Sequence, residues 1–114
     1  MDILEEIVAH KRVEVERLKE QLSEREIHSR VEALMATPEG SLVPSMKKAI
    51  KESSTGIISE FKRKSPSKGW IKEEGKAGVI PLSYQQNGAS AISILTDYEY
   101  FGGKDEFIVE ARKS

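Results

Sequence analysis

The spacing of apolar residues changes abruptly at Gly56, and this change constrains the fold more than any other feature of the chain. Before Gly56, apolar residues recur three, four or seven positions apart, which is the spacing of amphipathic helices. After it, the segment GIISEFK alternates with period two and predicts a strand. A helical pattern over 79–87 and a second apolar run over 89–96 then follow. This strand–helix–strand order predicts parallel strands and an α/β fold.

Three helices are predicted before the first strand. A long helix over residues 2–21 follows from one apolar stripe, made of Leu4, Val8, Val15, Leu18 and Leu22. Ser23 and Glu26 form the Ser-x-x-Glu pattern of a capping box, so a second helix should begin there and end near Pro38. A short third helix is expected over 45–50.

The second half of the chain predicts two loops, a buried strand and a last helix. Residues 63–78 and 97–103 are rich in Gly and charged or aromatic side chains, and both are expected to be loops. The strand over 89–96 is apolar and almost free of charge, which is typical of a strand buried on both faces. Gly88 should end the preceding helix as its C′ residue, and Asp105 should cap the final one.

Composition excludes several classes of protein and of site. The 114 residues carry a net charge of −1 and no cysteine, so disulfides and thiolate metal sites are excluded. We infer no metal site and no nucleic-acid partner, because His10 and His28 stand apart from other ligand types and the chain has no basic excess. No apolar run is long enough to span a membrane and the N-terminus is acidic, so a cytoplasmic protein is expected.

Positive charge is nevertheless concentrated after the first strand, where residues 62–76 hold six basic and two acidic side chains. Glu60 and Lys62 lie two apart on that strand and therefore project from one face at its carboxyl end, where parallel α/β folds bind ligands. The pair can equally be a solvated ion pair. Ser65 and Ser67 follow in the turn SPSKG, which offers hydroxyls and backbone N–H groups; a simple turn, a phosphorylation site or a basic tag remain alternatives.

A second cluster, LTDYEYFGG over 95–103, lies just past the carboxyl end of the second strand. It holds three of the seven aromatic residues, which can cap the core or form an apolar wall for an aromatic ligand. Both clusters would open at the same end of the sheet. Together they predict a site for an anionic aromatic small molecule.

The segments ISEFKRKSPSKGWI at 58–71 and YQQNGASAISILTDYEYFGG at 84–103 closely resemble the indole-3-glycerol-phosphate synthase family. The resemblance extends over essentially the whole chain, with Lys104 in place of the small hydroxyl residue often found there. It implies a lyase of tryptophan biosynthesis that closes a pyrrole ring on 1-(2-carboxyphenylamino)-1-deoxyribulose 5-phosphate with loss of carbon dioxide and water. No cofactor is implied.

The family's site residues map onto this sequence one by one. Glu60 and Lys62 match catalytic residues: the glutamate supports charge in the transition state, and the lysine contacts the anionic substrate. Substrate-binding positions are expected at four residues, namely Ser65, Ser67, Leu95 and Phe101. The family's general-acid lysine follows the third strand and is not among these 114 residues.

The resemblance also implies the architecture, a (β/α)8 TIM barrel preceded by an α-helical extension. Such a barrel takes roughly 250 residues, so we expect an N-terminal fragment, inactive alone, with the extension at 1–52 and the first two βα units at 53–114. Its open sheet edges could support self-association. The alternative is a non-catalytic binding module derived from a half barrel, and a nucleic-acid binder using 62–76 is a third reading.

Overall fold

The computed structural model describes residues 2–114 and divides into two compact units, Met1–Pro44 and Ser45–Ser114. The first contains α1 (Ile3–Gln21), α2 (Glu24–Met35) and a short 3₁₀-helix, η1 (Pro38–Leu42). The predicted cap of the second helix is confirmed, since the Ser23 hydroxyl accepts a hydrogen bond from the backbone N–H of Glu26 at 3.2 Å. No helix among residues 2–114 is long and apolar enough to cross a membrane.

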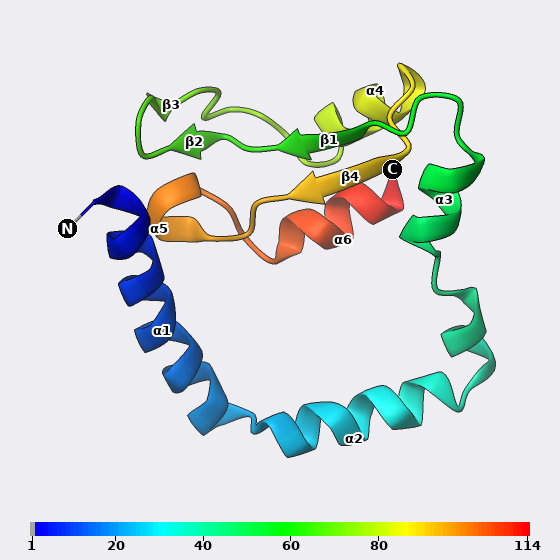
Figure 1. Cartoon of the computed structure of the whole chain (residues 1–114), viewed down its shortest axis with the longest axis horizontal. Coiled ribbons are helices and arrows are strands. Elements are labelled where there is room, and N and C mark those ends of the chain that lie inside the picture. The colour runs from blue at the N-terminus through cyan, green and yellow to red at the C-terminus, as the bar shows by residue number, and fades with distance from the viewer. Residues whose placement is uncertain (1) are drawn as a thin grey trace. The chain divides into compact units, whose positions relative to one another are not determined.

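The second unit begins with α3 (Met46–Glu52) and contains the strand–helix–strand order predicted from the sequence. Strand β1 (Ile58–Phe61) leads through α4 (Ile80–Gln86) to β4 (Ala91–Ile94), and α6 (Glu106–Lys113) follows. Figure 1 shows β1 and β4 side by side and pointing the same way, with α6 running along β4. This α/β arrangement is consistent with part of a TIM barrel. The predicted helical extension at 1–52 stays a prediction. The boundary between the two compact units, after Pro44, does not show where a barrel domain begins.

The two parallel strands pair in one register. Glu60 lies opposite Ser93, and Phe61 lies opposite Ile94. Because side chains alternate along a strand, the two pairs project from opposite faces of the sheet. Gly88 ends α4 with a φ of 110°, as predicted for its C′ glycine.

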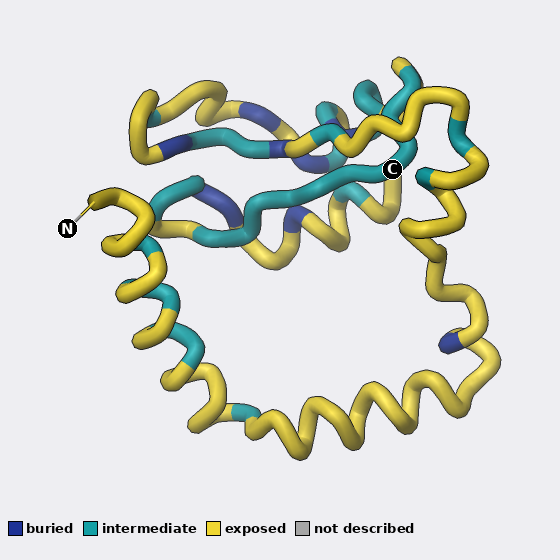
Figure 2. Tube along the Cα trace, viewed as in Figure 1, coloured by how far each residue is buried: buried dark blue, intermediate teal, exposed yellow. Residues whose placement is uncertain are grey.

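The buried core lies on the Phe61 face. Phe61, Ala77 and Phe107 are its buried hydrophobic residues among those described, and the Phe61 and Phe107 rings meet edge to face at 5.7 Å and 72°. Ile80 and Ile94 pack against this cluster. In Figure 2 the helix α2 of the first unit is exposed along its length, whereas most buried stretches belong to the second unit.

A cluster of hydroxyls closes the opposite, amino end of the sheet. Thr55 donates from its hydroxyl to the carbonyl of Gly88 at 2.6 Å, and Ser90 donates to the hydroxyl of Ser53. The backbone N–H of Ser90 also donates to the carbonyl of Ile57 at 2.8 Å. These bonds fix where the two strands begin relative to each other.

Four local predictions are wrong. Residues 63–78 contain a small antiparallel hairpin, β2 (Lys64–Ser65) with β3 (Gly69–Trp70), and 97–103 contain the one-turn helix α5 (Tyr98–Phe101). Asp105 precedes α6 but makes no side-chain capping bond, because its own backbone is already helical. Strand β4 is half-buried, not buried on both faces, since among residues 2–114 its one neighbouring strand is β1.

Removing the Phe107 ring should weaken this core most. We expect Phe107→Ala to lower the free energy of unfolding by about 3 kcal/mol, because the ring is 7% exposed and packs on Phe61. Ile108→Ala, the neighbouring position on α6 with 53% exposure, is the control and should change it by less than about 1 kcal/mol. Urea unfolding followed by the fluorescence of Trp70, the lone tryptophan, measures both. Equal effects of the two variants would contradict this core.

Candidate active site

The two predicted catalytic residues form an ion pair at the carboxyl end of β1. The ammonium Nζ of Lys62 lies 3.6 Å from Oε1 of Glu60. The Lys62 side chain is 34% exposed, and the Glu60 side chain is 47% exposed. Ser93, which lies opposite Glu60 in the register, donates from its hydroxyl to Oε2 of the same carboxylate at 3.2 Å. A carboxylate, an ammonium and a hydroxyl therefore converge on one face of the sheet, and sequence reasoning had not singled out Ser93.

An aromatic ring borders this charged group. The ring centroid of Phe101 on α5 lies 5.9 Å from Nζ of Lys62. Leu95 follows β4 directly, and its backbone N–H donates to the carbonyl of Phe61 at 3.2 Å. The strand alternation places Leu95 on the same face as Ser93. The geometry therefore brings charge and apolar surface together, as an anionic aromatic ligand requires.

The two serines of the turn are placed differently from each other. Ser65 is 8% exposed, and its hydroxyl accepts a hydrogen bond from the backbone N–H of Lys68 at 3.2 Å. This burial disfavours a phosphorylation tag, which needs an accessible serine. Ser67 is exposed, and among residues 2–114 no hydrogen bond joins either serine to Glu60 or Lys62. Substrate binding by Ser65 and Ser67 therefore stays a prediction.

Arg63 connects the two loops that follow the strands through hydrogen bonds of its side chain. Its guanidinium donates to the carbonyl of Gly102 from Nε at 3.1 Å and from Nη2 at 2.7 Å. A third bond runs from Nη1 to the carbonyl of Glu73 at 2.9 Å. The guanidinium carbon also lies 4.9 Å from the ring centroid of Phe107, which joins this connection to the core.

The next cation, Lys64, also has a local role. Its ammonium lies 5.3 Å from the ring centroid of Trp70, its partner across the hairpin, and donates to the carbonyl of Glu99 at 3.4 Å. Arg63 and Lys64 are therefore both engaged in contacts within the fold. Lys62 is the member of this run that lies beside Glu60.

The paired glycines let the second loop approach its own strand. Gly102 has a φ of 62°, a left-handed conformation that L residues with side chains rarely adopt. At Gly103 a Cβ would lie 2.0 Å from the carbonyl oxygen of Leu95. This close approach explains why two adjacent glycines follow the strand. The glycine pair is the sequence signal that could have indicated the hydrogen bonds from Arg63 to this loop.

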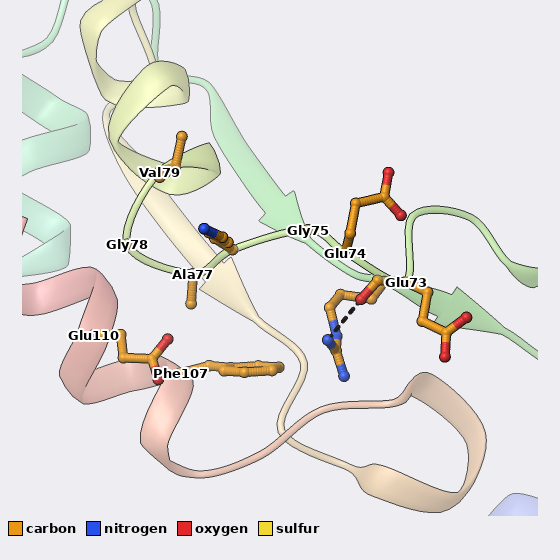
Figure 3. A pocket seen from close by; sticks show the side chains of 10 residues that line it. Glu73, Glu74, Gly75, Ala77, Gly78, Val79, Phe107 and Glu110 are labelled. Carbon is orange, nitrogen blue, oxygen red and sulfur yellow. Dashed lines mark hydrogen bonds between the residues drawn. The ribbon is translucent and has the colours of Figure 1, made fainter.

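A shallow pocket of about 430 Å³ lies on the core side of this loop system, away from the Glu60 carboxylate. Figure 3 shows Phe107 and Glu110 of α6 facing the segment that carries Gly75, Ala77 and Gly78. None of the six predicted site residues lines it. Its lining mixes acidic and basic side chains with one aromatic ring, and Arg63, one of its cations, is already bonded to backbone carbonyls. We therefore take the Glu60–Lys62 group as the candidate site.

Comparison with known proteins gives this arrangement a family context. The family profile described as "Indole-3-glycerol phosphate synthase" matches residues 4–114. A relative of that name from Bacteroides thetaiotaomicron is 47% identical over 111 residues, which cover 97% of this chain and 40% of the relative. Relatives of the same name from Aliarcobacter butzleri and Acidithiobacillus ferrooxidans are 38% and 36% identical, covering 98% and 99% of this chain and 42% of each relative. The chain thus spans about two fifths of the length of these relatives.

Replacing the Arg63 guanidinium should weaken the hydrogen bonds that connect the two loops. We expect Arg63→Lys to lower the free energy of unfolding by about 1–2 kcal/mol, because an ammonium keeps the charge but cannot make the three bonds in this geometry. Arg112→Lys, at an exposed position in the last turn of α6, is the matched control. Urea unfolding and the emission maximum of Trp70 would measure the change. If both substitutions had the same small effect, the hydrogen bonds of Arg63 would not stabilise the connection between the loops.

Proposed function

The chain belongs to the indole-3-glycerol phosphate synthase family, and from this membership we propose that it supplies part of the active site of such an enzyme. The reaction is the decarboxylating and dehydrating ring closure of 1-(2-carboxyphenylamino)-1-deoxyribulose 5-phosphate. The observation that carries the proposal is the Glu60–Lys62 pair, 3.6 Å apart and bordered by Phe101, at the carboxyl end of β1. Carboxyl ends of strands are where barrel enzymes of this architecture hold their sites.

Each residue has a role that its chemistry fits. The Lys62 ammonium attracts the substrate carboxylate that is lost as carbon dioxide, and the Glu60 carboxylate stabilises positive charge that develops on the reacting part of the substrate. The aromatic part of the substrate packs against Phe101 and Leu95. The hydroxyls of Ser65 and Ser67 then offer hydrogen bonds to the polar part of the substrate.

The reaction needs no cofactor, the protein works in the cytoplasm, and further strands complete a (β/α)8 barrel. Because the general-acid lysine that the family requires is not among these residues, the 114 residues alone should be inactive. The competing reading is a binding module without catalysis, which would bind a partner but never form an indole ring.

A chimera separates these readings. We would join the 114 residues to the remaining three fifths of the Bacteroides thetaiotaomicron relative and follow indole fluorescence with the ribulose phosphate substrate. The chimera should be active, and the 114 residues alone should not. A folded chimera that forms no indole would contradict the enzyme reading and favour the binding module.

Within this chimera, Lys62→Met should lower kcat/KM by about 10²–10⁴-fold, because it removes the cation beside the reacting group while keeping the length of the side chain. Lys68→Met is the matched control, since the Lys68 side chain is exposed and makes no hydrogen bond or ion pair within residues 2–114. The control should stay close to the parent chimera. Similar losses in both would indicate a general effect of positive charge in this loop.

Self-association of the 114-residue chain belongs to the same proposal. Within the described residues the parallel sheet has two strands, so each strand has one edge without a partner strand. We expect the sedimentation coefficient of the purified chain to rise with concentration as these edges pair. A value that stays constant at that of a monomer over a hundredfold range of concentration would refute this part.

A further inference from the structure

Trp70 occupies a position that the proposed chemistry does not explain. It lies on β3 opposite Lys64, and its side of the hairpin returns toward the end of β1, where the backbone N–H of Ile71 donates to the carbonyl of Arg63 at 2.7 Å. The ring centroid lies 5.4 Å from the guanidinium carbon of Arg63 and 5.3 Å from the ammonium of Lys64. Two neighbouring cations thus hold one ring.

The same ring also rests against the second loop. A Cβ added to Gly102 would lie 2.8 Å from Cζ3 of Trp70 and 2.9 Å from Cη2, well inside van der Waals contact. The ring therefore fills the space that a side chain at Gly102 would take. The hydrogen bonds from Arg63 hold the Gly102 carbonyl, and the ring packs on the same residue.

This contact is adjacent in sequence to residues of the proposed site on both loops. Ser65 pairs with Gly69, the residue before Trp70, and Phe101 is the residue before Gly102. The ring therefore packs where the hairpin that carries Ser65 meets the turn that carries Phe101. Trp is suited to this role, because it is large and has few rotatable bonds.

We infer that Trp70 is a positioning residue that sets the width of the binding site between the Ser65 hairpin and Phe101, and thereby the affinity for the anionic aromatic substrate. The inference rests on the proposed function. Trp70 acts through the two loops and not on the reacting atoms, because its ring contacts Arg63, Lys64 and Gly102. Its loss should therefore weaken binding more than it slows the chemical step.

The test uses the active chimera described above. Trp70→Leu should raise KM about tenfold and leave kcat within about twofold, the pattern of lost uniform binding. Trp70→Phe, which keeps a smaller flat ring, should restore much of the affinity and serves as the rescue. A Trp70→Phe chimera that folds but shows the same KM as Trp70→Leu would count against the ring as a spacer.

Gly102→Ala tests the contact from the other side. The added Cβ should displace the ring and raise KM in the parent chimera, but should add much less in the Trp70→Leu background, where the two closest ring atoms are gone and Cβ of Lys64, at 3.3 Å, remains. Gly56→Ala is the matched control, since Gly56 has nearly the same φ, 63°, but nothing within 4 Å of its Cβ position. It carries the same backbone strain and should lower the melting temperature without changing KM.

The outcomes separate the two levels of inference. A parent chimera that folds but forms no indole would contradict the proposed function, and this inference with it. An active parent with an unchanged KM in Trp70→Leu would overturn the role of Trp70 alone and leave the proposed function standing. Equal effects of Gly102→Ala in both backgrounds would also overturn it, because the substitution would then act through strain and not through the ring.

Discussion

The hydrogen bonds from Arg63 to the carbonyls of Gly102 and Glu73 support the rest of the second unit. A two-stranded parallel sheet with three buried hydrophobic residues among those described has little core with which to hold long loops. A bond that involves a charged group contributes at most about 1.5–3 kcal/mol, and less where water competes for it, as at the exposed bond to Glu73. Three such bonds from one guanidinium can therefore hold both loops against the strand ends where apolar burial is scarce.

Strand alternation explains why three consecutive cations have three different roles. Lys62 continues the face of Glu60 and lies beside its carboxylate. Arg63 projects from the other face, where it reaches the ring of Phe107 and the two carbonyls. Lys64 belongs to the hairpin and contacts Trp70. The basic run is thus not a uniform patch, because its charges contact a carboxylate, a core ring with two carbonyls, and the hairpin.

Periodicity predicted the elements whose stability is local or depends on burial along one face. The helices α1 and α2, the strands β1 and β4, and the pairing of Glu60 with Lys62 followed from spacings of three to four or of two. The cap by Ser23 followed from four residues of sequence. These features need no information from distant parts of the chain.

The features that the sequence did not predict depend on distant partners. The hairpin of β2 and β3 has two residues in each strand, and its ring contact with Gly102 joins positions 32 residues apart in the sequence. A four-residue helix such as α5 is too short to show a hydrophobic period, although the bond from Tyr100 N–H to the Asp97 carboxylate is a local cap. The half-burial of β4 depends on how many strands lie beside it, which composition cannot reveal.

The exposure of the Glu60–Lys62 pair constrains the chemistry that it can support. At 47% and 34% exposure, water screens the two charges, and such pairs contribute about 0–1 kcal/mol. The same charges interact several times more strongly when water is excluded, but their desolvation then costs several kcal/mol per ion unless each is hydrogen-bonded. The hydroxyl of Ser93 already meets one of these needs on Glu60. A working site built on this pair must therefore surround it with further polar groups, because a purely apolar cover would disfavour the two charges on which the proposed chemistry depends.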